Sequence, residues 1–229
     1  MERVDKILSN LGYCTRKFAQ RFLKDHDVTL NGVKITDASG KVDSRNILID
    51  NGPIDHPDGI FILLNKPKGY VCSHDIADGR LVFELFPDQW IDRNPAPTTI
   101  GRLDKDTTGV LLITDNTKLV HILTSPKREI DKIYQATVDK PLSDNLIAEF
   151  ASGTLLLTGE QKPCLPAKLT FTSETTAEVV LHEGRYHQIK RMFAHFGFTV
   201  TELHRSRFGD YTVEDLACGE WKDLPMPKV

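Results

Sequence analysis

Residues 50–59, DNGPIDHPDG, interrupt the chain with a segment rich in Asp, Pro and Gly that holds one aliphatic residue, Ile54. Such a composition favours turns and extended linkers over helices and strands. The chain has 229 residues, of which 40% are hydrophobic, so two modest cores can form. The sequence therefore predicts a small unit over residues 1–50, a linker over 51–59 and a larger unit over 60–229.

The first unit has the pattern of two short helices followed by a hairpin. Four apolar residues recur at helical spacing and Gly12 follows them as a cap (Val4, Ile7, Leu8 and Leu11). Thr15 can cap a second helix, and VTLNGVKI, residues 28–35, predicts a hairpin that turns at Asn31-Gly32. Basic residues gather on these helices and can share one outer surface: Arg3, Lys6, Arg16, Lys17, Arg21 and Lys24.

The second unit has more predicted strands than helices, and the two kinds do not alternate. Strands are expected at 60–64, 110–114, 132–138, 154–158, 167–172 and 177–182. Helices are expected at 117–125, 143–151 and 186–196. This order predicts an α+β domain on a mostly antiparallel or mixed sheet with flanking helices.

Composition excludes several classes of protein. Neither a membrane-spanning run nor a signal peptide is present, so a cytoplasmic protein without membrane association is expected. The four cysteines lie far apart and are interpreted as packing residues rather than as a disulfide framework or zinc site. The formal charge of −3 means that any nucleic acid must be bound by local basic patches.

The segment GRLDKDTTG, residues 101–109, places Asp104 and Asp106 among hydroxyls and glycines ahead of an apolar run. One interpretation is a surface turn, because Asp, Thr and Gly are common turn residues. Another is a haloacid-dehalogenase-type phosphatase, with Asp210 and Asp215 as magnesium ligands. That mechanism requires a nucleophile after a buried parallel strand, and the preceding residues PTTIGR fit such a strand poorly.

A third interpretation joins segments that lie far apart. GRLDKDTTG, DKIYQATV and EGRYHQIKRMF together resemble the three active-site segments of RNA pseudouridine synthases. The likeness extends to NKPKGYVCS and to residues 203–224, and residues 1–50 resemble an S4-type RNA-binding domain. It is greatest for the branch that modifies small-subunit (16S) ribosomal RNA. The resemblance implies an isomerase that acts on one uridine of the small ribosomal subunit or its assembly intermediate; an inactive RNA-binding or assembly factor is the alternative.

The resemblance also implies roles for three residues. Asp104 would act as nucleophile or charge stabiliser when the bond between ribose and uracil N1 breaks, by a covalent or an elimination route. Arg185 would be the cation that keeps this carboxylate ionised, and its spacing of four from Ile189 predicts one helical face for both. Tyr134 would stack on the base and accept the C5 proton.

Further residues are assigned around this pocket. Ile189 would line the pocket, Arg102 would fill the gap left by the extruded base, and Asp106 would support the turn. The remaining assignments are contacts with RNA, at Arg3, Lys6, Arg16, Lys17, Arg21, Lys66, Lys68, Lys190 and Arg191. The isomerisation is redox-neutral, so neither a cofactor nor a metal is expected, and the protein is expected to be a monomer.

Overall fold

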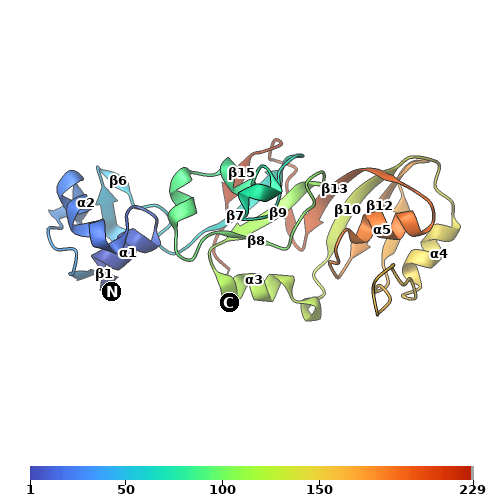
Figure 1. The fold of residues 1–229 in the computed structure, drawn as a ribbon, viewed down its shortest axis with the longest axis horizontal. Helices are drawn as coiled ribbons and strands as arrows, with labels where there is room; N and C mark the ends of the chain where they lie inside the picture. Colours follow the sequence, from blue (N-terminus) through green and yellow to red (C-terminus); the bar gives the residue numbers. More distant parts are fainter. Residues whose placement is uncertain (228–229) are drawn as a thin grey trace.

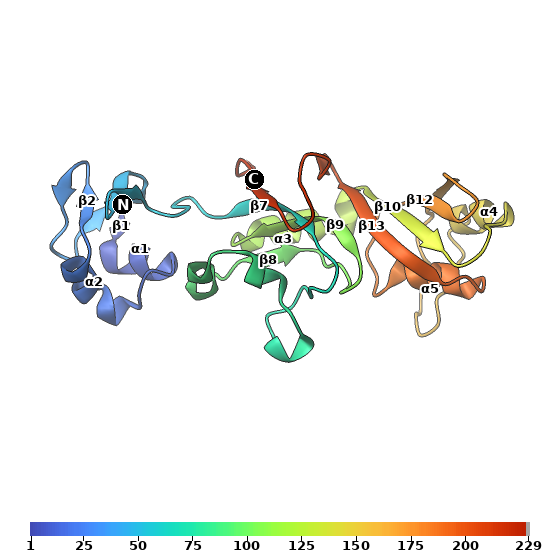
Figure 2. The same cartoon turned by 90° about the horizontal axis from the view of Figure 1, so that it is seen from above.

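The computed structural model of the chain describes residues 1–227 and has an elongated shape (Figure 1). The N-terminal residues form a small unit at one end, and the rest of the chain extends away from it in both views (Figures 1 and 2). Within residues 1–227, no helix has the length and apolar character needed to cross a membrane.

The N-terminal unit packs two helices against small sheets. The helices are α1 (Val4–Asn10) and α2 (Ala19–Asp25). Four strands pair in the order β3-β2-β5-β6, and β1 pairs with β4. Their bounds are β1 Glu2–Arg3, β2 Val28–Leu30, β3 Val33–Lys34, β4 Lys41–Val42, β5 Ile47–Ile49 and β6 Gly52–Pro53. The predicted hairpin turn is confirmed, because Asn31 and Gly32 both have positive φ, 51° and 78°.

The boundary of this unit lies later than the sequence predicted. Strand β6 falls inside the expected linker, and its partner is β5 of the first unit. Ile54 is buried in the core of that unit, with residues of both helices. The hydrophobic effect thus draws the one aliphatic residue of the segment into the first unit, which leaves 55–59 as the connection.

The larger unit is built on one mixed sheet. Its strands run in the order β11-β12-β10-β13-β9-β7-β15, with β14 beside β13 and β8 beside β9. Strand β13 runs parallel to β9, and the other pairings between the named strands of this sheet are antiparallel. The bounds are β7 Phe61–Lys66, β8 Thr98–Ile100, β9 Thr108–Thr114, β10 Lys132–Val138, β11 Lys168–Phe171, β12 Thr176–Leu181, β13 Val200–Phe208, β14 Tyr211–Thr212 and β15 Trp221–Asp223. The predicted α+β class is confirmed.

Three helices cover the two faces of this sheet. They are α3 (Thr117–Thr124), α4 (Asn145–Ala151) and α5 (Gln188–His195). Alternate residues of β7 and β9 enter two separate cores, one shared with α4 and α5 and the other with α3. Short 3₁₀ turns occupy Arg16–Phe18, Ser44–Asn46, Ile76–Asp78, Val82–Leu85, Asp88–Asp92 and Pro126–Arg128.

The structure differs from the sequence analysis in three places. Residues 154–158 do not form a strand, although Leu155 and Leu157 are buried, because the segment lacks a partner strand. Strand β13 was not expected, because its sequence VTELHRSRF carries charged residues that mask an apolar alternation. Cys218 is exposed rather than a packing residue.

The connection at residues 55–59 is held by a polar network. The Asp55 backbone N–H donates to the Tyr13 hydroxyl at 2.8 Å, and Trp90 and Arg93 donate to the Asp55 carboxylate. His56 bridges two carboxylates. Its hydrogen bond to Asp55, opposed by burial and aided by Asp223 at 2.9 Å, raises the pKa of His56 to about 8. The connection is therefore anchored at both ends.

Candidate active site

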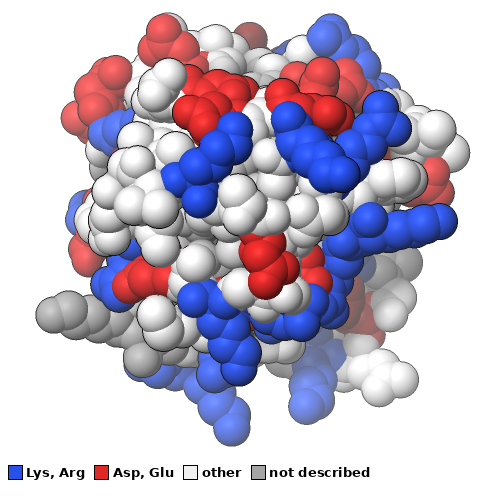
Figure 3. Space-filling model, turned by 90° about the vertical axis from the view of Figure 1, so that its left-hand side faces the viewer, with Lys and Arg blue, Asp and Glu red and all other residues white. Residues whose placement is uncertain are grey.

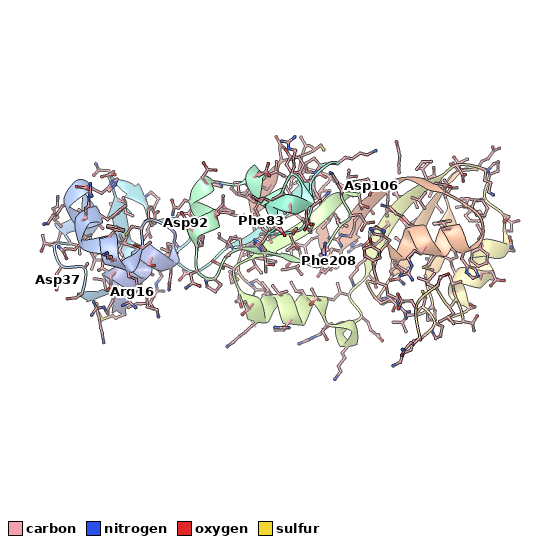
Figure 4. All side chains as sticks on the ribbon, viewed as in Figure 1. Arg16, Asp37, Phe83, Asp92, Asp106 and Phe208 are labelled. Carbon is pink, nitrogen blue, oxygen red and sulfur yellow. The ribbon has the colours of Figure 1, made fainter. Side chains whose placement is uncertain are left out.

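A cleft of about 690 Å³ opens in the larger unit beside β10, β13 and the start of α5. All five residues expected to surround the base line this cleft: Arg102, Asp104, Tyr134, Arg185 and Ile189. Phe208, another lining residue, and Asp106, beside the cleft, lie near the middle of the larger unit in Figure 4. The fold thus brings together segments more than 80 positions apart in the sequence.

The loop between β8 and β9 carries Asp104 and is anchored from beneath. Leu103 and Thr107 are buried on either side of Asp104. The Lys66 amine donates to the backbone carbonyls of Asp104 and Thr107 at 3.1 and 2.9 Å. Burial lowers the pKa of Lys66 to about 8, against the pull of nearby acidic groups. The expectation that Lys66 contacts RNA is wrong, because its side chain is fully buried and holds this loop.

Gly109 allows β9 to approach β13 closely. Its φ is 101°, and a Cβ at this position would lie 2.2 Å from the backbone oxygen of Arg205. A left-handed conformation and this contact both require glycine. The close approach brings the Asp104 loop next to the strand that supports Tyr134.

Lys190 and His187 are the basic partners of Asp104. Lys190 Nζ lies 3.0 Å from Asp104 Oδ2, and His187 Nε2 lies 3.3 Å from Oδ1, so each carboxylate oxygen has its own partner. Lys190 Nζ also lies 2.5 Å from Asp106 Oδ1. Burial opposes ionisation of Lys190, but its hydrogen bonds to Asp106 and Asp104 keep its pKa above the ordinary value. Lys190 is therefore paired with the carboxylates of Asp104 and Asp106, whereas the sequence analysis expected it to contact RNA.

Arg185 is not the cation beside Asp104, in contrast to the sequence expectation. Its guanidinium donates to Glu183 at 3.0 Å and to the backbone oxygens of Lys162 and Pro163. Helix α5 begins only at Gln188, after His187 with a φ of 48°. Arg185 therefore precedes the helix and does not share a helical face with Ile189, although both line the cleft.

Arg191 also holds the chain near residues 158–163. It donates to Thr158 O at 2.7 Å and to Glu160 Oε1 at 3.0 Å. The expected RNA contact is thus replaced by intramolecular bonds in this structure. Together Arg185 and Arg191 fix a loop at the side of α5.

Tyr134 lies on β10 with 9% of its surface exposed. Arg205 Nη1 donates to its hydroxyl at 3.4 Å. Ile189 is buried at the wall of the cleft, whereas Arg102 is exposed and, within residues 1–227, makes neither an ion pair nor a side-chain hydrogen bond. Lys68 is exposed close to Asp106. Tyr134 and Ile189 are therefore buried residues of the cleft, and Arg102 is an exposed one.

The five N-terminal basic residues that were expected to contact RNA lie on one unit, and four of them are paired with acids. Arg3 and Arg16 share Asp5, whose pKa the Arg3 hydrogen bond lowers to about 2. Lys6 pairs with Glu2 and Arg21 with Asp25. Lys17 lies 5.9 Å from the centre of the Phe18 ring. Figure 3 shows basic and acidic side chains interspersed on this end of the molecule, so the surface is mixed in charge.

Sequence reasoning missed the roles of His187 and Arg205 in the cleft, and did not consider Lys132. The signal for Lys132 was its place two residues before Tyr134, which puts both on one face of a strand.

The phosphatase interpretation is wrong, because Asp104 precedes β9 and neither Asp210 nor Asp215 lines the cleft. No group of three metal-ligating side chains occurs in the described part of the chain.

Comparison with known proteins assigns the chain to a family. The family described as RNA pseudouridylate synthase matches residues 60–195, and the S4 domain family matches residues 2–48. The chain is 36% identical to proteins named ribosomal small subunit pseudouridine synthase A from Yersinia pestis and Escherichia coli K12, over 99% of its length and 96% and 98% of theirs. A crystal structure of a pseudouridylate synthase aligns with a TM-score of 0.67 and 35% identity over 98% of this chain and 96% of that one. The chain belongs to the RNA pseudouridylate synthase family and is an enzyme of this class with an N-terminal S4 domain.

Proposed function

We propose that the protein isomerises one uridine of small-subunit 16S ribosomal RNA to pseudouridine, at uridine 516 in standard 16S numbering. Support for the RNA class comes from the names of relatives that align over nearly the full chain. The observation that carries the chemistry is the single cleft shared by Asp104, Tyr134 and Arg102. A cytoplasmic, monomeric enzyme without cofactor fits this proposal.

Asp104 is the proposed catalytic carboxylate. Breaking the bond between ribose C1′ and uracil N1 builds positive character on the sugar, which a carboxylate stabilises or traps. Lys190 at 3.0 Å and His187 at 3.3 Å hold the two carboxylate oxygens in place. This arrangement is compatible with attack on ribose, attack on the base, or elimination, because each needs an ionised and oriented Asp104.

Tyr134 and Arg102 have complementary roles in this proposal. Extrusion of a uridine from its stack costs a few kcal/mol and leaves a gap in the RNA. Arg102 is exposed at the cleft and unpaired within residues 1–227, so its guanidinium can enter that gap. Tyr134 lies in the same cleft and offers a ring for the extruded uracil and a hydroxyl for removal of the C5 proton.

The N-terminal unit is proposed to bind RNA outside the cleft. Its basic residues Arg3, Arg16 and Lys17 contact phosphates, which position the enzyme without reading sequence. Two of them are held in place by Asp5. An assembly factor without catalysis is the alternative function, and the intact acidic, aromatic and basic groups of the cleft favour the enzyme.

The proposal is tested by tritium release from 16S rRNA that carries 5-tritiated uridine. The wild-type protein should release tritium, and Asp104→Asn should not. Asp106→Asn is the matched control, since Asp106 shares Lys190 with Asp104 but does not line the cleft; it should keep most of the activity. Absence of release by the wild type would leave the assembly-factor alternative, and release by Asp104→Asn at the wild-type rate would refute the catalytic assignment. Mapping of the product by primer extension identifies the target nucleotide.

A further inference from the structure

Two neighbouring strands place a pair of cations beside a pair of aromatic rings in the cleft. Lys132 of β10 lies opposite Phe208 of β13, and Tyr134 lies opposite Arg205. All four residues line the cleft. Residues opposite each other in a sheet have adjacent side chains, so the four form one patch, called here the cationic floor.

Arg205 brings a buried charge to the cationic floor without a counter-charge. Only 1% of the residue is exposed. Its Nε donates to Val110 O at 2.7 Å and its Nη1 to the Tyr134 hydroxyl, while Nη2 is buried without a partner. Buried guanidinium groups are ordinarily paired with a carboxylate or phosphate. Within residues 1–227, Arg205 makes no such ion pair, so the fold keeps a positive charge there at a cost to stability.

Lys132 adds a second positive charge, and its ammonium group has three N–H donors. Its amine donates to Ile130 O at 3.0 Å and lies 5.4 Å from the centre of the Phe208 ring. The side chain is half-buried, and in the described chain it also has no carboxylate partner. Burial and the charge of Arg205 lower the pKa of Lys132, while the more distant carboxylates of Asp131 and Glu183 raise it. Because neither Lys132 nor Arg205 forms an ion pair with a carboxylate in the described chain, an anionic ligand can supply the missing partner.

We propose that Lys132 binds the carbonyl edge of the target uracil, and that the charges of Lys132 and Arg205 together stabilise the negative charge that the base carries after its bond to ribose breaks. This inference rests on the proposed function. When the C1′–N1 bond breaks, its electron pair stays on N1 and spreads to O2 and O4. The Lys132 amine donates to a carbonyl oxygen, and Arg205 adds its charge from beneath Tyr134. The charge on the base is lost again when C5 bonds to C1′, a step that releases the Asp104 carboxylate wherever it has bonded to C1′. The C5 proton then leaves to a base, and N1 is protonated.

A nucleobase fits the cationic floor better than a phosphate. Arg205 is buried beneath Tyr134, the ring proposed to hold the extruded base. The phosphates belong to a hydrated backbone that must pass outside the cleft, along the exposed surface to which the lining residue Arg102 belongs. A positive charge that acts on the transition state more than on the bound substrate raises kcat rather than affinity.

The test compares Lys132→Gln with Lys132→Arg and with the matched control Lys140→Gln. Lys140 follows the other end of β10 and also lies over a phenylalanine ring, Phe198 at 4.7 Å, but it does not line the cleft. Single-turnover rates and KM are measured on 16S rRNA, with thermal unfolding as a check of folding. Lys132→Gln should lower the rate about 100-fold with KM changed less than about threefold, the loss typical of one electrostatic donor. Lys132→Arg should be at least about tenfold faster than Lys132→Gln, and Lys140→Gln should have the rate and KM of the wild type.

Two outcomes would overturn the inference. In either case the proposed function would stand, provided that the wild type is active and Asp104→Asn is not. One is a rate for Lys132→Gln equal to that of Lys140→Gln. The other is a weaker RNA affinity with an unchanged rate, together with a slope of log binding constant against log salt concentration that is smaller in magnitude by about one. This combination is the signature of a phosphate contact. If Asp104→Asn retains the wild-type rate, the proposed catalytic assignment fails whatever Lys132 does.

Discussion

Replacement of Lys190 by Gln should slow the isomerisation by roughly 10- to 150-fold. Lys190 Nζ lies 3.0 Å from Asp104 Oδ2, and both side chains are only about a quarter exposed, 23% and 25%. A hydrogen bond to a charged partner in such surroundings contributes about 1.5–3 kcal/mol net. Without Lys190 the carboxylate has to be oriented during the reaction, so we expect this energy to appear in the barrier, where each 1.36 kcal/mol is about tenfold in rate.

The assay is single-turnover tritium release at saturating enzyme, which separates the chemical step from RNA binding. Lys190→Arg keeps the charge and should lose less activity than Lys190→Gln. Arg185→Gln is the informative comparison, because Arg185 lines the same cleft but bonds to Glu183 and to the 162–163 backbone. Arg185→Gln should lower the melting temperature and leave the single-turnover rate close to that of the wild type. A larger loss of rate in Arg185→Gln than in Lys190→Gln would refute the assignment of Lys190 as the partner of Asp104.

Two further predictions concern stability, and urea unfolding measures both. Gly109→Ala should lower the free energy of unfolding by about 3 kcal/mol or more, because the new Cβ would lie 2.2 Å from a backbone oxygen of β13 at a φ of 101°; an unchanged value would mean that the two strands can separate without cost. His56 has its pKa raised to about 8 in the folded protein by its two carboxylate partners, so its contribution is complete below its ordinary pKa of 6.5 and is lost as pH rises through 8. Between pH 6 and 9 the wild type should therefore lose about 2 kcal/mol more stability than His56→Gln, and parallel pH profiles would contradict this role.

Much of the fold follows from local patterns in the sequence. The Asn31-Gly32 turn, helix α1 and strands β7, β9, β10 and β12 were predicted because their periodicity and turn residues act over a few positions. Strand β13 was missed for the opposite reason. Its buried Arg205 resembles a solvated residue until the partners Val110 and Tyr134, far along the chain, are known.

The site was predicted in its residue types but not in its pairings. The resemblance to pseudouridine synthases implied that Asp104, Tyr134 and Ile189 share one pocket, and all three line one cleft in the structure. The pairing of Asp104 with Arg185 was wrong, because helical spacing was applied to a residue that precedes α5. Arg191 and Lys66 were expected at the RNA surface, and both instead bind backbone carbonyls of neighbouring loops.

The sequence by itself determined that the chain has two units, a mixed fold and a set of acidic, aromatic and basic residues suited to this chemistry. The tertiary structure alone decided which cation serves Asp104, which lysine supports its loop, and which charges remain unpaired beside Tyr134. The physical reason is that an ion pair depends on a separation of a few ångströms and on burial. Both are set by the packing of β9, β10, β13 and α5, and no spacing along the chain encodes that packing.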